Sequence, residues 1–329
     1  MMPRLKVLLL SLATLSATAF GQNANPARPG TLNYIEGQAS IEGRQLSPNS
    51  VGNTELQAGQ ALSTANGKAE ILLTPGVFLR LGSDSTVEMI SPNLTSTEVK
   101  LERGRADVEV DQLYKQNTIL VDLNNGQTKL LKNGLYAFDA DDSIVRVFDG
   151  KADVSSRLSL RDNVKPIEVK GDRQLALMGE PSNPQRFDKN KSQDDLYNWS
   201  SLRSEYLGEA NVNLASDYAG APGFYPGWYW AGGSFGYTWL PGDGLFWSPF
   251  GYGFYSPYYI YGGGFIYGRY GHGIYPYRGG GYAYRGGQPI GSGNVRGAMT
   301  ARPSAGFSGG GGFHGGGMGG ISHGGGGHR

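Results

Sequence analysis

The sequence contains no cysteine, and its four histidines all lie after residue 270. Without thiols the chain can form no disulfide, no thiolate metal site and no cysteine nucleophile. Residues 30–180 therefore also lack the imidazole that catalytic triads and common zinc sites use. No pair of carboxylates stands out as a general acid and base for glycoside hydrolysis. We expect a protein that is not an enzyme and that uses no cofactor.

A strong net charge is also missing, because 29 basic residues face 28 acidic ones. Such a balance produces no strong field that would recruit nucleic acid or anionic lipid. Tyr-Arg-Gly-Gly occurs at residues 277–280 and 284–287, a pattern typical of proteins that bind single strands. Two copies in an exported chain are too few, and we expect no nucleic-acid partner.

Two groups of side chains are candidate metal ligands. His314, His323 and His328 lie in nearly pure glycine, a composition that chelates Cu or Zn loosely. They lack carboxylates and fixed geometry, so we predict no defined site there. Asp139, Asp141 and Asp142 lack the ligand spacing and final Glu of an EF-hand and read as an exposed acidic turn.

Long hydrophobic runs are absent beyond the N-terminus, so no later segment is predicted to span a membrane as a helix. In residues 1–21, Arg4 and Lys6 precede an apolar run, and Ala19 and Gly21 fit the −3 and −1 positions of a cleavage site. This pattern predicts a signal peptide that is cleaved near Gly21; an uncleaved anchor is the alternative. The processed chain would then be in the periplasm, in the outer cell envelope or outside the cell.

Residues 30–180 show apolar side chains at every second position. Val77, Leu79 and Leu81 alternate with Phe78 and Arg80, and the same period recurs in residues 106–110 and 119–123. This period places the apolar groups on one face of a strand. Dipeptides that favour tight turns separate the runs: Asn66-Gly67, Pro75-Gly76, Asn125-Gly126, Asn133-Gly134 and Asp149-Gly150. The prediction is an all-β domain, an antiparallel β-sandwich or a barrel-like fold.

Residues 99–108 and 145–154 resemble each other, and each copy reads as strand, turn glycine and strand. The echo fits either two similar hairpins or an internal duplication.

The order of these segments resembles the FecR-type periplasmic domain of bacterial cell-envelope proteins. The matching stretches are residues 37–41 (GQASI), 56–62 (LQAGQAL), 67–81 (GKAEILLTPGVFLRL), 101–106 (LERGRA) and 147–154 (VFDGKADV). The resemblance implies an all-β domain without enzymatic activity. In the founding members this domain receives a signal from an outer-membrane siderophore transporter, and the same chain controls a sigma factor in the cytoplasm. The family's Gly-Thr-x-Phe element is replaced here by residues 134–138 (GLYAF), and no cytoplasmic segment is expected, so sigma-factor control is not carried over.

A helix is predicted over residues 192–209, with a capping box formed by Ser192 and Asp195 and a stop at Gly208. Its apolar face would consist of Leu196, Trp199, Leu202 or Arg203, and Tyr206. We expect this face to dock on the β-domain; binding of a partner is the alternative.

Residues 220–287 are rich in aromatic residues, glycine and proline, and residues 288–329 are rich in glycine and histidine. Because glycine raises the entropy cost of ordering, we predict a semi-ordered surface segment followed by a disordered tail. The expected partner is an envelope protein or a cell-wall glycan, with self-association as the competitor. The predicted interaction residues are Trp199, Tyr206, Trp228, Trp230, Trp239 and Trp247.

Together these patterns predict an exported, non-enzymatic binding or scaffolding module with an adhesive or self-associating tail. The alternative is a signal-sensing module that interacts with an outer-membrane transporter or a separate membrane regulator.

Overall fold

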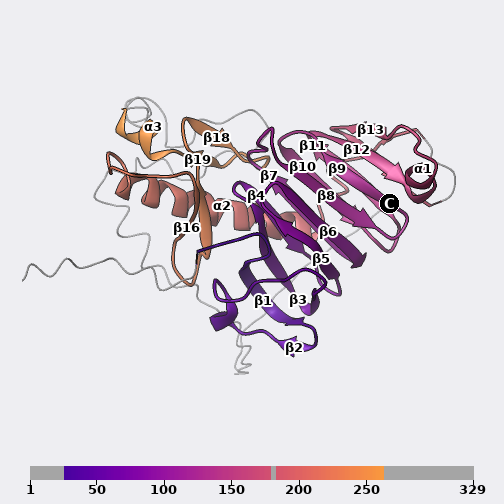
Figure 1. Cartoon of the computed structure of the whole chain (residues 1–329), viewed down its shortest axis with the longest axis horizontal. Helices are drawn as coiled ribbons and strands as arrows, with labels where there is room; N and C mark the ends of the chain where they lie inside the picture. The colour runs from indigo at the N-terminus through magenta and orange to yellow at the C-terminus, as the bar shows by residue number, and fades with distance from the viewer. Residues whose placement is uncertain (1–25, 179–182, 263–329) are drawn as a thin grey trace, which may run out of the picture. The chain divides into compact units, whose positions relative to one another are not determined.

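The computed structural model describes residues 26–178 and 183–262, and strands are its commonest regular element (Figure 1). Fifteen strands form one large sheet. Its first strands are β1 (Leu32–Ile41), β2 (Arg44–Gln45), β3 (Ala61–Thr74), β4 (Val77–Leu81), β5 (Thr86–Asn93), β6 (Ser96–Arg103) and β7 (Arg105–Val110). Its later strands are β8 (Thr118–Leu123), β9 (Gly126–Leu130), β10 (Gly134–Asp139), β11 (Ile144–Asp149), β12 (Lys151–Ser156), β13 (Ile167–Lys170), β14 (Arg173–Ala176) and β15 (Gln185–Arg186).

Two small hairpins and four helical segments complete the described chain. The hairpins pair β16 (Gly227–Trp230) with β17 (Tyr237–Leu240) and β18 (Leu245–Trp247) with β19 (Gly253–Tyr255). The helical segments are η1 (Pro48–Ser50), α1 (Arg157–Arg161), α2 (Asp195–Asp217) and α3 (Pro257–Tyr261).

The large sheet curls so that its ends approach each other. Its strand order is β13-β12-β9-β8-β6-β5-β3-β4-β7-β10-β11-β14-β15, and β1 pairs with β3 off this path. Strand β13 nevertheless contacts β11 and β14, which lie near the other end of that order. Strands β6 and β8 run parallel, whereas the other paired neighbours are antiparallel. The prediction of an all-β, barrel-like fold is confirmed.

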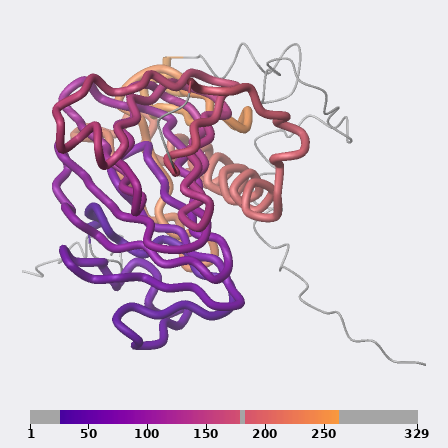
Figure 2. Tube along the Cα trace, turned by 90° about the vertical axis from the view of Figure 1, so that its right-hand side faces the viewer, coloured from indigo at the N-terminus to yellow at the C-terminus, as the bar shows by residue number. Residues whose placement is uncertain are grey.

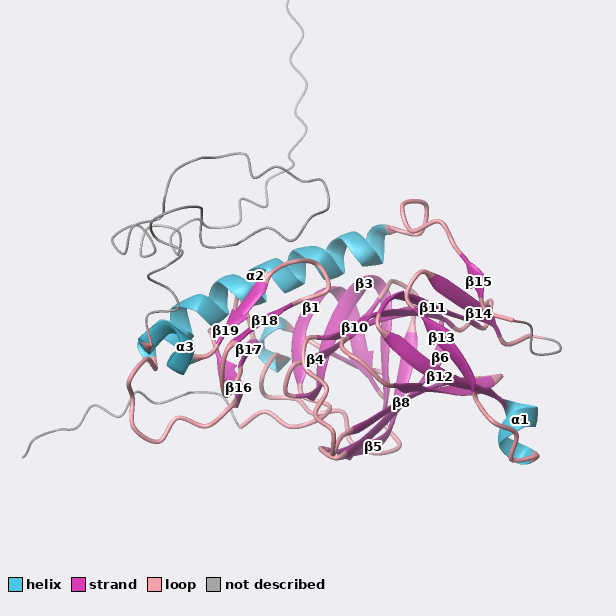
Figure 3. Ribbon diagram, turned by 90° about the horizontal axis from the view of Figure 1, so that it is seen from above, coloured by secondary structure: helices cyan, strands magenta, loops and turns pink. Residues whose placement is uncertain are grey.

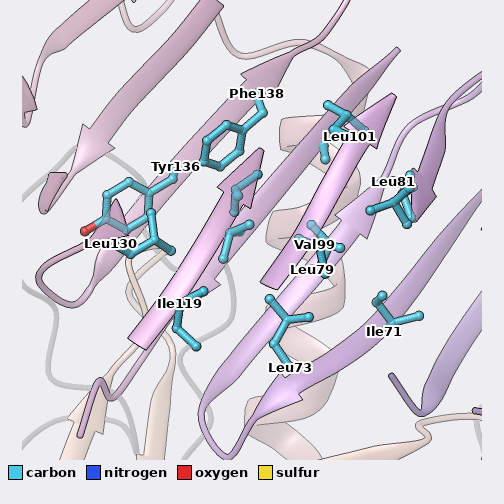
Figure 4. Packing of buried hydrophobic residues seen from close by; sticks show 14 of the residues in the cluster. Ile71, Leu73, Leu79, Leu81, Val99, Leu101, Ile119, Leu130, Tyr136 and Phe138 are labelled. Carbon is cyan, nitrogen blue, oxygen red and sulfur yellow. The ribbon is translucent and has the colours of Figure 1, made fainter. Parts of the chain in front are cut away.

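The inner face of the curled sheet carries the main hydrophobic core. Figure 4 shows Ile71, Leu79, Val99, Leu101 and Ile119 packed together from neighbouring strands. Each of these side chains lies on the apolar face of its strand, and all five are at most 1 % exposed. Their burial removes the apolar face of each strand from water, which is the main force that closes the sheet.

Four of the five predicted turn dipeptides lie at strand ends, but Asn66-Gly67 does not. Gly67 lies inside β3, where it is the partner of Gly37 on β1. A Cβ atom at Gly67 would lie 2.4 Å from the backbone oxygen of Glu36. This glycine therefore permits a close approach of two strands, and the prediction of a turn there is wrong.

The two similar segments are corners and not hairpins. Gly104 joins β6 to β7 and Gly150 joins β11 to β12, yet neither pair of strands is hydrogen-bonded together. Both glycines adopt positive φ angles, 75° and 103°, which glycine reaches without steric cost. Each corner sends the chain to a distant part of the sheet.

Helix α2 lies along one side of the sheet (Figures 2 and 3) and contacts β4 and β7, so the predicted docking is confirmed. Its predicted limits are wrong at both ends. The N-cap is Asp194, whose side chain accepts a hydrogen bond from the Tyr197 amide at 2.9 Å. The helix does not stop at Gly208 but continues to Asp217. A Cβ atom at Gly208 would lie 3.3 Å from the Tyr252 Cβ, so this glycine leaves room for the hairpin of β18 and β19.

The buried face of α2 also differs in part from the prediction. Of the two alternatives, Arg203 is buried, and Leu202 is 44 % exposed. Tyr206 is 42 % exposed and does not belong to the docked face. Leu196 and Trp199 are buried as expected.

The aromatic segment is ordered and packed as far as Gly262, so the prediction of a semi-ordered surface segment is corrected for this part. Trp239 is fully buried in a cluster with Leu72, Phe78, Leu207, Tyr237 and Phe254. The sheet and α2 supply the aliphatic side chains that the segment itself lacks. The predicted signal peptide, the arginine-glycine repeats and His314, His323 and His328 lie outside the described residues.

Trp239→Ala tests whether the aromatic segment belongs to the folded core. Removal of a fully buried indole should lower the free energy of unfolding by about 3–5 kcal/mol. Tyr261→Ala, at a ring that is 72 % exposed, is the matched control and should change it by less than about 0.5 kcal/mol. Urea denaturation of both variants gives the values, and equal stabilities would contradict the packed arrangement.

Candidate functional site

A row of charged side chains lies on the face of the sheet opposite the main core. The strand register places Glu70 on β3 opposite Arg80 on β4, and Arg80 opposite Asp107 on β7. Glu109 follows two residues later on β7 and therefore points to the same face. The four side chains are no more than 4 % exposed, and Asp111, just beyond β7, is 1 % exposed.

Arg80 is the centre of this row. Its Nε donates to Glu70 Oε2 at 2.7 Å, and its Nη1 donates to Glu109 Oε2. Arg203 on α2 donates from Nη2 to Glu70 Oε1 at 2.8 Å, so Glu70 binds one arginine from the sheet and one from the helix. This shared carboxylate ties the two elements together.

Two serines of α2 extend the contact along β7. Ser200 donates to Asp107 Oδ2 at 2.9 Å, and Ser204 donates to Glu109 Oε1 at 2.6 Å. With Arg203, they form a polar stripe at i, i+3 and i+4 spacing on the helix. The helix therefore docks through hydrogen bonds to charged groups as well as through apolar contact.

Two asparagines hold the hairpins in the same way. Asn33 on β1 donates from Nδ2 to Glu70 Oε1 at 2.8 Å, and its Oδ1 accepts from the Tyr237 amide at 2.6 Å. Asn211 on α2 accepts from the Tyr255 amide at 2.7 Å and donates to the Trp239 carbonyl at 2.8 Å. Sheet, helix and both hairpins thus share one network.

The network buries more acids than bases. It contains the carboxyl groups of Glu70, Asp107, Glu109 and Asp111 but only two guanidinium groups. Uncompensated buried charge is strongly unfavourable, so burial should favour the protonated form of two of the four acids.

The pKa values divide the acids in this way. Burial alone would raise the pKa of Glu70, but Arg203 and Arg80 outweigh it and lower the pKa to about 2. Burial raises the pKa of Asp107 to about 7, against the hydrogen bond from Ser200. Burial and the neighbouring Glu109 carboxylate raise the pKa of Asp111 well above its usual range. Asp107 and Asp111 are therefore the two acids in which burial favours the protonated form.

Aromatic side chains close one end of the network. The Trp199 indole donates to Glu36 Oε2 at 2.9 Å, and the Arg203 guanidinium lies 4.1 Å from the centre of the Tyr34 ring. A cation over an aromatic face gains electrostatic attraction. Trp199 thus makes its polar contact within the chain.

The contacts of Ser200, Arg203 and Ser204 with Asp107, Glu70 and Glu109 form a buried clamp between α2 and the sheet. A groove of about 570 Å³ lies elsewhere and is lined mainly by polar residues between Arg44 and Gln60. Residues 26–178 and 183–262 contain no group of three side chains suited to hold a metal ion. In the acidic turn, Asp139 accepts from the Asp142 amide and Asp141 from the Gly104 amide, so both side chains stabilise backbone.

The predicted interaction residues occupy different environments. Trp239 is fully buried and Trp199 is 8 % exposed. Trp228, Trp230 and Trp247 are half-buried. Tyr206 is the most exposed of the six and lies on the outer side of α2, where its ring contacts Phe235.

Sequence reasoning did not single out the buried network. Its signal was present, because Glu70, Arg80, Asp107 and Glu109 occupy the alternate positions of strands that are apolar on their other face. Such positions usually face water, and pairing them requires the register of three strands that are distant in sequence.

Comparison with known proteins identifies the β-domain. Residues 60–153 match the family model described as FecR protein, so the chain contains a FecR domain. No curated protein matches the sequence.

Two crystal structures of a candidate anti-sigma factor from Parabacteroides distasonis ATCC 8503, at 2.50 and 1.65 Å resolution, are similar to part of the chain. Each is 17 % identical, with a TM-score of 0.34, and the match covers 40 % of this chain and 62 % of that one. The chain thus spans less than two thirds of these proteins, and a likeness of this size carries no functional conclusion.

Within residues 26–178 and 183–262, none of the helices has the length and apolar character needed to span a bilayer.

Arg80→Met tests the centre of the network. Loss of this guanidinium leaves Glu70 and Glu109 buried with less compensation, which should cost about 3–5 kcal/mol of unfolding free energy. Arg105→Met is the matched control, because Arg105 pairs with Asp194 at the surface and its side chain is 47 % exposed. The control should lose less than about 1 kcal/mol in urea denaturation. Similar losses in both variants would show that Arg80 does not organise the interface.

Asp107 makes stability depend on pH. Its pKa is about 7 in the folded chain against 3.8 for an aspartate exposed to water, so the folded state keeps a proton that the unfolded state has lost. Stability should therefore fall as pH rises from about 4 to about 7, by on the order of 3–4 kcal/mol for this group. Glu70 acts oppositely, and its contribution is lost as pH falls from 4.5 towards 2.

Asp107→Asn isolates this effect because the amide keeps the shape and cannot ionise. Denaturation at a series of pH values should show a flatter profile for the variant between pH 4 and 7. Ser155, on β12, supplies a control: Ser155→Ala leaves the network intact and should keep the wild-type slope. An unchanged slope in Asp107→Asn would contradict the assignment.

Proposed function

We propose that the chain is an exported, non-enzymatic module of the bacterial cell envelope that binds another envelope component. The observation that carries this proposal is the exposed tyrosine surface formed by Tyr225, Tyr258 and Tyr261, whose side chains are 76 %, 53 % and 72 % exposed. The FecR domain and the clamp make a single scaffold behind this surface.

Contacts among neighbouring rings support the tyrosine surface. Phe224 packs against Tyr258 with ring centres 5.7 Å apart, and the Tyr229 hydroxyl donates to the Tyr225 carbonyl at 2.6 Å. The contact with Phe224 restricts the Tyr258 ring, and an exposed ring with restricted orientation loses little entropy when a ligand binds it.

The chemistry of the surface favours an uncharged ligand. Residues 218–262 contain one charged side chain, Asp243. Tyrosine offers an apolar face and a hydroxyl, a combination that suits the faces and hydroxyl groups of sugar rings. A cell-wall glycan is therefore the proposed ligand. In the same aromatic segment, the half-buried Trp228 and Trp230 lie on β16 and Trp247 lies on β18. Self-association through the aromatic and glycine-rich segment has no comparable support.

A second candidate function is signal sensing through an outer-membrane transporter or a separate membrane regulator. The FecR match over residues 60–153 favours it. Here the partner would be a protein, and the β-domain itself would be the receiving surface.

A binding assay distinguishes these functions. The purified full-length chain is incubated with isolated cell wall and with solubilised outer membrane, beside a triple variant that carries Tyr225→Ala, Tyr258→Ala and Tyr261→Ala. Loss of wall retention by at least roughly tenfold in the variant, at unchanged thermal stability, supports glycan binding. Equal retention of both proteins contradicts it. Recovery of a transporter by both proteins, without wall retention, supports the sensing function.

A further inference from the structure

Exposed aliphatic side chains gather at α1, at the end of the sheet where β12 finishes. Leu158, Val164 and Met178 are 57 %, 57 % and 60 % exposed, the highest values for large aliphatic or methionine side chains in the described part of the chain. Leu160, 49 % exposed, belongs to the same group. We call these four residues the apolar tip. Clustered exposed apolar groups mark an interaction site more often than isolated ones do.

Backbone hydrogen bonds hold α1 and the residues after it in place. Ser156 caps α1 by accepting from the Ser159 amide at 3.1 Å. The Val164 amide donates to the Ser159 carbonyl at 2.9 Å, which brings Val164 back beside the short helix. The exposure of these side chains is thus a consequence of an ordered turn.

Further bonds place Met178 near the same turn. The Arg157 amide donates to the Asn125 carbonyl at 2.8 Å, and the Asn125 side chain donates to Ser143 Oγ at 2.8 Å. The Leu177 amide donates to the Ser143 carbonyl at 2.8 Å, and Met178 is the next residue. Segments distant in sequence therefore contribute to one tip, and Figure 3 shows α1 projecting beyond the strands.

Basic side chains alternate with the apolar ones. Residues 157–165 contain Arg157, Arg161 and Lys165 but one acid, Asp162, which pairs with Arg161 at 2.9 Å. The three basic residues are exposed. Arginine and lysine beside inserted apolar groups can place their charged ends among lipid headgroups while their stems stay in contact with the acyl region.

We propose that the apolar tip and its three basic residues dock on an anionic lipid surface. The complementarity of positive charge to anionic headgroups favours lipid. Four side chains on a projecting turn are also far fewer than the roughly 20–30 residues that each partner contributes to a stable protein interface. The tip lies on elements other than those of the tyrosine surface, so this proposal stands apart from glycan binding.

The absence of native cysteine permits a site-specific test on the full chain. Leu160→Cys carries an environment-sensitive fluorophore at the tip, and Leu94→Cys, at a site 52 % exposed on another turn, carries it as the matched control. Vesicles of phosphatidylglycerol and phosphatidylcholine are compared with vesicles of phosphatidylcholine alone. We expect a blue shift at position 160 with the anionic vesicles, and none at position 94 or with the neutral vesicles.

Unlabelled variants test the two components in a vesicle sedimentation assay. Removal of each basic residue, by Arg157→Gln, Arg161→Gln or Lys165→Gln, should weaken binding roughly fivefold. Leu158→Ser and Leu160→Ser should each weaken it roughly tenfold, whereas Leu94→Ser should leave it unchanged. An equal shift at both labelled positions, a shift with neutral vesicles, or no shift at position 160 would overturn the proposal.

Discussion

The structure depends on how one buried arginine is neutralised. Arg80 lies in the middle of a sheet, fully removed from water, and a lone guanidinium there would be prohibitively unfavourable. Glu70 and Glu109 supply opposite charge from the adjacent strands, and they in turn need donors. Arg203 and Ser204 of α2 provide them. The sheet is therefore complete only when α2, which starts more than 100 residues after Arg80, covers it.

This dependence changes the meaning of the C-terminal aromatic residues. A glycine-rich segment with few aliphatic side chains cannot form a core alone, but it can add to a core that already exists. Asn33 and Asn211 satisfy the hairpin backbone, and Phe78 and Leu207 receive the rings. The buried Trp239 thus belongs to the scaffold, and the exposed tyrosines form the surface proposed to bind a ligand.

The sequence allowed the sheet to be predicted better than the clamp. Period-two patterning in residues 77–81 and 106–110 identified strands and their apolar face correctly, because that pattern is local. Whether the opposite face is buried depends on segments distant in sequence. From the strand pattern alone Arg80 and Asp107 could face water, and it is α2 that covers them. Gly67 and Gly208 misled for a related reason, since both serve close packing by distant segments, whereas local rules assign glycine to turns and helix ends.

Native-state hydrogen exchange tests the central claim that sheet, helix and hairpins unfold as one cooperative unit. The amides of Tyr237 and Tyr255, which donate to Asn33 and Asn211, report on the hairpins, and those of Leu79 and Val108 report on the sheet. The account predicts that all four exchange with the same opening free energy, equal to that of global unfolding. Exchange of the hairpin amides at a much lower free energy, while the sheet stays protected, would show that the C-terminal segment is an independent attachment and would contradict the account.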